Sequence, residues 1–156
     1  YLNNMCGILA EFYFEENKID QQTKDKFSDN LSLMAHRGPD ASNVISFDKA
    51  ILGHRRLSII DLSEAGKQPM QSGKVWITFN GEVYNFKELR AELQNEFYFK
   101  SNTDTEVILN GYRKWGIKTL LKKIEGMFAF TIYDEECGKM YICRDRAGIK
   151  PLFFCG

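Results

Sequence analysis

The feature that most constrains this chain is a cysteine near its start, Cys6, which opens an apolar and aromatic run that reaches Phe14. A run of this composition predicts a strand buried in a core. If Met5 is the initiator, its removal leaves the thiol and the α-amine on one residue. An α-amine titrates near pH ~8 and a thiol near ~8.5, so the amine can act as the base for the thiol at neutral pH. Cys6 is therefore a candidate nucleophile, although burial as a small hydrophobe is the more common fate of a free cysteine.

Apolar spacing, capping signals and Gly or Pro breaks divide the rest of the chain into helices and strands. Helices are predicted over 20–34 and 85–96, with another beginning at Thr103. Asn85 with Glu88, and Thr103 with Glu106, have the spacing of a capping box. Strands are predicted over 44–47, 50–54, 75–79, 127–133 and 139–143, with a polar loop over 66–73 and a last strand beginning at Lys150. This order indicates layered α+β packing and not a parallel βαβ array.

The composition fits one folded domain and argues against several classes of partner. The chain has 156 residues, of which 44% are hydrophobic, enough to bury a core. Its 21 basic residues balance its 21 acidic ones, so no charge footprint indicates nucleic acid or an anionic membrane. No run approaches the ~20 apolar residues of a membrane span, and the start lacks the pattern of a signal peptide. We therefore expect a cytoplasmic protein.

The four cysteines favour reduced thiols over a metal site. Cys6, Cys137, Cys143 and Cys155 have no CxxC spacing, and only two histidines could join them as ligands. Reduced thiols are typical of the cytosol. We expect no metal in this chain.

The dipeptide Asn80-Gly81 follows a predicted strand and has two interpretations. Asn-Gly is a strong signal for a tight turn. An Asn side-chain amide and a Gly backbone N–H can also point at one developing negative charge, and glycine permits the backbone to approach closely. The dipeptide alone favours the turn.

Arg56 and Asp104 are candidates for binding the two charges of an α-amino acid. Arg56 lies in an otherwise apolar segment, where its guanidinium can clamp a carboxylate; a surface charge or a pair with Asp61 is the alternative. Asp104 follows Thr103 at a predicted helix start, where an acid is common because it stabilises the helix dipole. An Arg and an Asp that face each other across a pocket would bind an amino acid.

These features belong to eight ordered segments, which read MCGI (5–8), HRGPD (36–40), GHRRLSIIDL (53–62), QPM (68–70), FNGEVYN (79–85), TDTEVI (103–108), GMFAF (126–130) and RDRAGIKPL (144–152). Together they resemble the glutamine amidotransferase domain of glutamine-hydrolysing asparagine synthetases, a class II domain of the N-terminal-nucleophile (Ntn) hydrolase type. The resemblance runs from Met5 to the end of the chain. It favours this branch over the amidotransferases that make phosphoribosylamine or glucosamine phosphate.

The resemblance implies a fold and a set of roles. The implied fold is an α+β, four-layer αββα sandwich of the Ntn-hydrolase type. Cys6 is implied as the nucleophile, and Asn80 with Gly81 as the oxyanion hole. Arg56 would bind the glutamine α-carboxylate and Asp104 the α-ammonium. The residues implied to line the same pocket are Leu57, Ser58, Ile59, Ile60 and Glu82.

The implied chemistry is attack of Cys6 on the side-chain amide of glutamine, release of ammonia and hydrolysis of a γ-glutamyl thioester. In the whole family enzyme the ammonia reaches a second domain, where ATP-activated aspartate accepts it. ATP and magnesium belong to that synthetase domain, and its Ser-Gly-Gly phosphate loop does not occur in this sequence. Two alternatives stay open: ammonia supply to another carboxylate, such as a sugar acid in polysaccharide assembly, and a catalytically silent scaffold or sensor domain.

Two departures from the family pattern bear on activity. Residues 1–5 precede Cys6 and are interpreted as a leader, an expression scar or a misassigned start, so we expect negligible glutaminase activity while they block the α-amine. The amidotransferase domain is assigned to 6–156 and is expected to be C-terminally truncated, because family domains continue for several strands. Glutamine and the synthetase domain are the expected partners, and a homodimer is compatible with the sequence.

Overall fold

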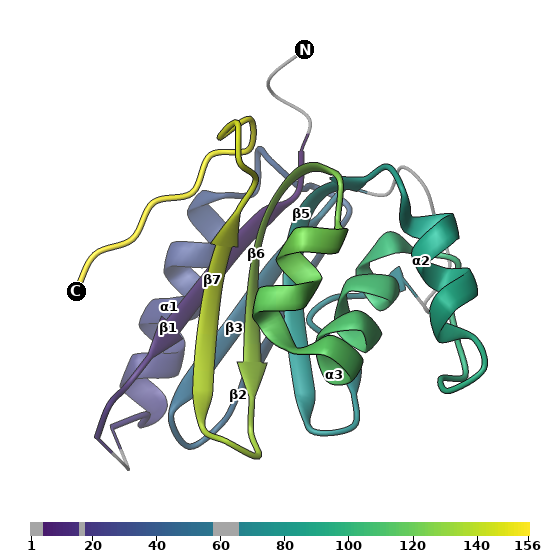
Figure 1. Ribbon diagram of the computed structural model, residues 1–156. Helices are drawn as coiled ribbons and strands as arrows, with labels where there is room; N and C mark the ends of the chain where they lie inside the picture. The colour runs from purple at the N-terminus through teal and green to yellow at the C-terminus, as the bar shows by residue number, and fades with distance from the viewer. Residues whose placement is uncertain (1–4, 16–17, 58–65) are drawn as a thin grey trace.

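The computed structural model describes residues 5–15, 18–57 and 66–156, whose arrangement is shown in Figure 1. The elements follow one another in the order β1, α1, β2, β3, β4, β5, α2, α3, β6 and β7. The strands form two antiparallel sheets. The described part of the chain is therefore a mixed α and β structure with antiparallel sheets, which agrees with the predicted α+β class.

The first sheet has the strand order β1-β3-β2. β1 spans Gly7–Phe12, β2 spans Ala41–Ser46 and β3 spans Ala50–Arg56. The predicted strand pair is confirmed, with β2 starting earlier than expected and β3 continuing to Arg56. β3 is the most buried strand of this sheet because it pairs on both of its edges.

The second sheet has the order β4-β5-β6-β7. Its strands are β4 (Met70–Ser72), β5 (Val75–Val83), β6 (Gly126–Asp134) and β7 (Lys139–Arg144). The loop predicted over 66–73 is wrong where β4 pairs with β5. The strand predicted from Lys150 is also wrong, because residues 150–156 form no strand and Asp145 instead accepts the Lys150 N–H.

Helix α1 (Gln21–Leu33) packs on the first sheet. Asp20 caps it, with Oδ1 accepting the Thr23 N–H at 2.8 Å. Phe27 is buried against Gly53 of β3, where a Cβ atom would lie 2.7 Å from the Phe27 ring. Glycine at this position therefore lets the helix approach the strand.

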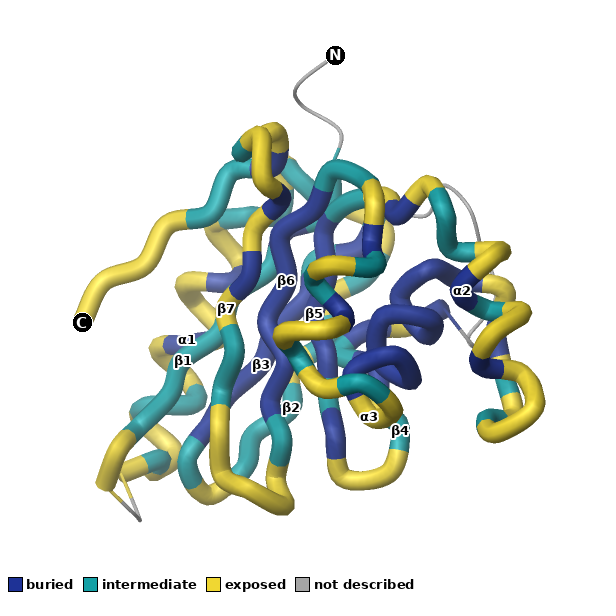
Figure 2. Tube along the Cα trace, viewed as in Figure 1, coloured by how far each residue is buried: buried dark blue, intermediate teal, exposed yellow. Residues whose placement is uncertain are grey.

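Helices α2 (Phe86–Leu93) and α3 (Asp104–Lys123) lie against each other, and α3 packs on the second sheet. The Thr103 hydroxyl caps α3 as predicted. The capping box predicted at Asn85 is wrong, because its side chain donates to the Lys123 carbonyl and accepts the Glu125 N–H. The largest buried cluster joins these helices to the sheet, as the dark tube in Figure 2 shows along β5, β6 and the first half of α3.

The two sheets face each other through alternate residues of their strands. On β5, Phe79 belongs to the core shared with α2 and α3, whereas Thr78 donates to the Gly53 carbonyl of β3 at 3.1 Å. On β3, Leu52 packs with Tyr133 of β6. Every second side chain of these strands therefore enters the space between the sheets. Within the residues described, no helix is long and apolar enough to cross a membrane.

Candidate active site

Cys6 and Arg56 share one face of the first sheet. Gly7, the first residue of β1, faces α1, because a Cβ atom there would lie 3.0 Å from Met34 Cε. Cys6 therefore faces the opposite way, toward the second sheet. Gly7 pairs with Arg55 in the register of β1 with β3, which brings Cys6 opposite Arg56. Cross-strand neighbours of this kind lie on the same face of a sheet.

The Cys6 thiol is half-buried against the residue that follows β3. Its Sγ accepts the Leu57 N–H at 3.4 Å and donates to the Leu57 carbonyl oxygen at 3.6 Å. Burial raises the pKa of Cys6, and the Leu57 contact and the charges of Arg56 and Arg37 offset only part of that rise. The thiol is therefore protonated at neutral pH and needs a base before it can attack.

Asn80 and Gly81 lie inside β5, so the interpretation of this dipeptide as a tight turn is wrong. Asn80 is buried and shares a face of β5 with Thr78, the face directed at the first sheet. At Gly81, φ is 157° and a Cβ atom would lie 2.2 Å from the Met127 carbonyl oxygen. Only glycine fits there, and a rigid strand rather than a loop positions both residues.

Asp104 lies in the first turn of α3 and is tied to the end of β5. Its Oδ2 accepts the Val83 N–H at 2.9 Å. Burial raises the pKa of Asp104, backbone N–H groups lower it, and the neighbouring Glu82 carboxylate raises it further. This buried carboxyl group therefore lies beside the strand that carries Asn80 and Gly81.

Two cations without a predicted role lie at the same end of the molecule. Arg37, in the loop after α1, lowers the pKa of both Cys6 and Lys150. Lys150 is only 8% exposed, and its Nζ lies 2.8 Å from Sδ of Met5, the residue before Cys6. Both cations lie in segments that carry the family resemblance, Arg37 in 36–40 and Lys150 in 144–152. Their place in these segments is the sequence signal that could have identified them.

The loop that carries Lys150 is fixed to the strand that faces Gly81. The Asp145 carboxylate accepts the backbone N–H groups of Phe128, Ile149 and Lys150. Phe128 is the residue of β6 that pairs with Gly81. Backbone hydrogen bonds therefore connect the Lys150 loop to the strand pair that holds Asn80 and Gly81.

The remaining predicted lining residues divide into two groups. Leu57 contacts Cys6 directly, and Glu82 lies exposed near the end of β5. Ser58, Ile59 and Ile60 lie outside the described residues. In the described ranges, no group of three His, Cys, Asp or Glu residues is arranged to hold a metal ion.

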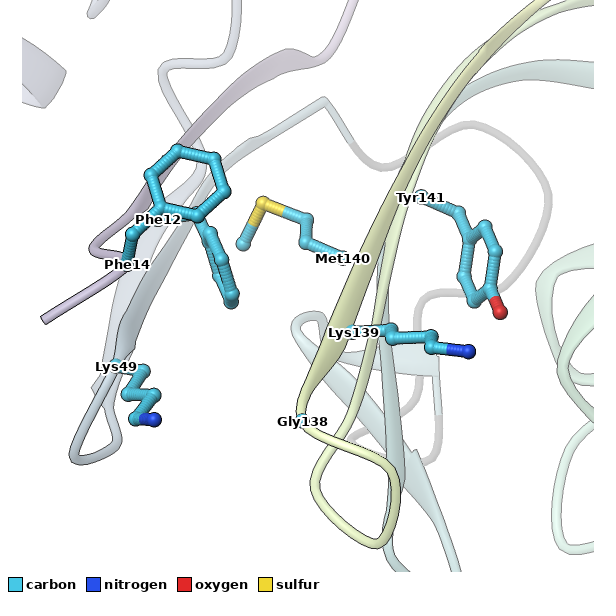
Figure 3. A pocket seen from close by; sticks show the side chains of 7 residues that line it. All are labelled: Phe12, Phe14, Lys49, Gly138, Lys139, Met140 and Tyr141. Atoms are coloured by element: carbon cyan, nitrogen blue, oxygen red, sulfur yellow. The ribbon is translucent and has the colours of Figure 1, made fainter.

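A cavity of about 360 Å³ lies at the other end of β1, away from Cys6 (Figure 3). Figure 3 shows Phe12 and Met140 reaching toward each other, while Tyr141 points away to the far side of its strand. In the described part of the chain, its lining includes none of the predicted site residues: it consists of Phe12, Phe14, Lys49, Gly138, Lys139, Met140 and Tyr141. This cavity is separate from the candidate active site.

Comparison with known proteins identifies the family. The glutamine amidotransferase domain family matches residues 5–156. The chain is 38% identical to asparagine synthetase (glutamine-hydrolyzing) 3 of Bacillus subtilis and 40% identical to asparagine synthetase B (glutamine-hydrolyzing) of Escherichia coli. It is also 38% identical to amidase chry2 of Gibberella zeae. Each alignment covers 96% of this chain but only 24% to 26% of the relative, so the chain spans about a quarter of their length. The chain belongs to the glutamine amidotransferase domain family.

Proposed function

We propose that this chain is a glutamine-hydrolysing domain in which Cys6 is the nucleophile. The observation that carries the proposal is that strand register and alternation direct Cys6, Arg56 and Asn80 to the sides of the two sheets that face each other. Membership of the amidotransferase family supports the same activity, as do the names of the two synthetase relatives, which are glutamine-hydrolysing.

The glutamine main chain binds to two oppositely charged residues. Arg56 pairs with the α-carboxylate through its guanidinium fork. Asp104 pairs with the α-ammonium, and that cation holds the carboxyl group ionised against the effect of burial. Leu57 and Glu82 line the same pocket, and the substrate side chain extends toward Cys6.

The hydrolysis then proceeds through a thioester. The free α-amine of Cys6 takes the thiol proton while Sγ forms a bond to the amide carbon of glutamine. The Asn80 side-chain amide and the Gly81 N–H donate to the resulting oxyanion. When the carbon–nitrogen bond breaks, the amine returns its proton to the leaving nitrogen, and ammonia departs. Water hydrolyses the thioester, which gives glutamate and restores the thiol.

The pairwise packing of the elements supports the fold that this family assignment implies. Helix α1 packs on the first sheet, the first sheet faces the second, and α3 packs on the second sheet. We assign this arrangement to the four-layer αββα sandwich of the Ntn hydrolases. Residues 6–156 form the amidotransferase domain, and residues 1–5 precede its nucleophile.

In the complete protein, the ammonia passes to an ATP-dependent synthetase domain that amidates aspartate. The basis is that the chain matches about a quarter of each synthetase relative. ATP and magnesium bind to that domain. The amidase relative supports a second candidate, in which a different carboxylate accepts the ammonia. Asparagine formation by the full-length protein from glutamine, aspartate and ATP tests the first candidate, and its absence with continued glutamine hydrolysis favours the second.

The direct test compares ammonia release from glutamine by two forms of the chain. One form begins at Tyr1 and the other at Cys6. Because only the second has a free α-amine on the nucleophile, we expect activity in that form and negligible activity in the first. Equal rates would contradict the amine-based mechanism. If neither form releases ammonia but the Cys6 form binds glutamine by calorimetry, the domain is a sensor or scaffold.

A further inference from the structure

We propose that Lys150 is a positioning residue whose ammonium keeps the α-amine of Cys6 in its neutral, proton-accepting form. The inference rests on the proposed function, because it concerns the amine that serves as the base there. An ordinary α-amine titrates near pH ~8 and is therefore mostly protonated at pH ~7. At pH ~7 only about a tenth of such an amine is neutral, so a nearby charge that lowers its pKa enlarges the fraction that can accept the thiol proton.

Lys150 is close enough to the Cys6 nitrogen to act on it. Lys150 Nζ lies 2.8 Å from Met5 Sδ, and Met5 is bonded directly to Cys6. The covalent bonds from Met5 Sδ to the Cys6 nitrogen span at most about 6 Å, so Lys150 Nζ lies within about 9 Å of that nitrogen. While Met5 is present, Lys150 is 8% exposed. When Met5 is removed, the α-amine of Cys6 is the group that faces this region.

The backbone holds Lys150 in this place. Asp145 Oδ2 accepts the Lys150 N–H at 3.0 Å, and Arg144 Nε donates to the Lys150 carbonyl at 2.6 Å. Arg144 also donates to the Gly148 carbonyl at 2.6 Å. Asp145 Oδ2 in turn accepts the Phe128 N–H of β6 at 3.2 Å. Lys150 therefore projects from an anchored loop, and the distance to Cys6 is set by the fold.

The charges around Lys150 come from four different elements. Burial lowers the pKa of Lys150, and so does Arg37 from the loop after α1; Glu82 of β5, Asp145 of the same loop and Cys6 raise it. Glu82 and Asp145 thus stabilise the ammonium against burial. Arg56 of β3 faces Cys6 as a further cation. Like charges disfavour one another, so an ammonium formed on Cys6 is destabilised beside Lys150 and its pKa is lowered.

The test uses the chain from Cys6 to Gly156 and three variants: Lys150→Met, Lys150→Arg and Lys139→Met. The first removes the charge and keeps the methylene stem. The second keeps the charge. The third removes one positive charge at the start of β7, from the lining of the cavity in Figure 3, and serves as the control. Two quantities are measured for each: the acidic limb of the kcat/KM profile for glutamine, and the α-amine titration by ¹⁵N NMR of cysteine-labelled protein.

We expect Lys150→Met to raise both midpoints by about 1 pH unit, because a repelling charge at this distance is removed. Lys150→Arg and Lys139→Met should leave both midpoints within about 0.2 unit of the parent. Unshifted midpoints in a folded Lys150→Met variant would overturn the inference, even if its activity falls equally at every pH. If the parent releases no ammonia but the NMR shift is present, the inference stands and the proposed function fails.

Discussion

The space between the two sheets has two unlike ends. At one end, a buried cluster of Ala50, Leu52 and Tyr133 is covered by Phe12, Phe47, Trp76 and Met140, and the Phe47 ring lies 4.8 Å from that of Tyr133. At the other end, the facing side chains are those of Cys6, Arg56 and Asn80. β3 and β5 each contribute to both ends, and Cys6 directly precedes β1, which ends at Phe12. A few residues along one strand therefore separate the aromatic cluster from the polar side chains.

This difference shows how a small domain can keep a polar site rigid. The aromatic end fixes the separation and register of the strands through buried apolar area. The same strands then hold Cys6, Arg56 and Asn80 at a fixed separation across the space between the two sheets. We expect substitutions at the aromatic end to change stability and substitutions at the polar end to change activity.

The largest expected effect is loss of the nucleophile. In protein that begins at position 6, Cys6→Ala should reduce glutamine hydrolysis by more than about 10³-fold. The substitution removes the thiol that forms the thioester in the proposed mechanism. The free energy of unfolding in urea should change by less than about 1 kcal/mol, since the Cys6 side chain is small and only half-buried. Retention of most activity would remove Cys6 from the mechanism.

The next effect concerns the oxyanion. Asn80→Ala should lower kcat by about 10² to 10³-fold with a small change in KM, because its amide is proposed to bind charge that develops only in the transition state. Steady-state kinetics over a range of glutamine concentrations separates the two constants. A rise in KM with kcat unchanged would mean that Asn80 binds the ground state instead.

At the aromatic end, Tyr133→Ala should cost about 3 to 4 kcal/mol of unfolding free energy, because it truncates a buried ring between the sheets. Below the unfolding transition, kcat should stay within about twofold of the parent. Urea unfolding and kinetics on the same samples give both values, with Tyr133→Phe as the matched control. A loss of kcat as large as that of Asn80→Ala would show that the two ends are not separable.

The smallest expected effect is a pH dependence of the stability. It arises at His54, which lies between the aromatic and polar ends of the space between the sheets. Burial lowers its pKa to about 4, a contact with the Phe79 backbone offsets this only in part, and Arg56 lowers it further. Among the residues that the structure describes, neither ring nitrogen has a partner at hydrogen-bond geometry. The unfolded chain therefore binds the proton more readily, and stability present above pH ~6.5 is lost as the pH falls toward ~4.

That loss should amount to as much as about 3 kcal/mol in the free energy of unfolding. Urea titrations at pH values from ~7 to ~4 measure it, and His54→Leu should remove this component. If the two proteins lose stability in parallel, His54 is not the group responsible.

Local signals predicted the elements whose ends depend on neighbouring residues alone. Asp20 caps α1 because its side chain reaches an N–H three residues away. The turn preference of Asn80-Gly81 does not predict its structure, because pairing with β6 along the whole of β5 overrides it. The capping spacing at Asn85 is overridden in the same way, since its side chain bonds to Lys123 at the end of α3 and to Glu125 just beyond it.

The candidate site was predicted in part for the same reason. The resemblance marked Cys6, Arg56 and Asn80, and strand alternation explains why they meet. The sequence predicts no role for Lys150 and Arg37, because their proximity to Cys6 depends on loops folded against strands far away in sequence. The spacing of residues along the chain does not show which loops fold against which distant strands.

The most direct test of the central claim is the site of covalent labelling by a diazo-ketone analogue of glutamine. Protein that begins at Cys6 is incubated with the analogue, and intact mass and peptide mapping locate the adduct. The account predicts a single adduct on Cys6, suppressed by excess glutamine, with the exposed thiols of Cys137 and Cys155 unmodified as internal controls. Labelling of Cys137 or Cys155 while Cys6 stays unmodified would contradict it.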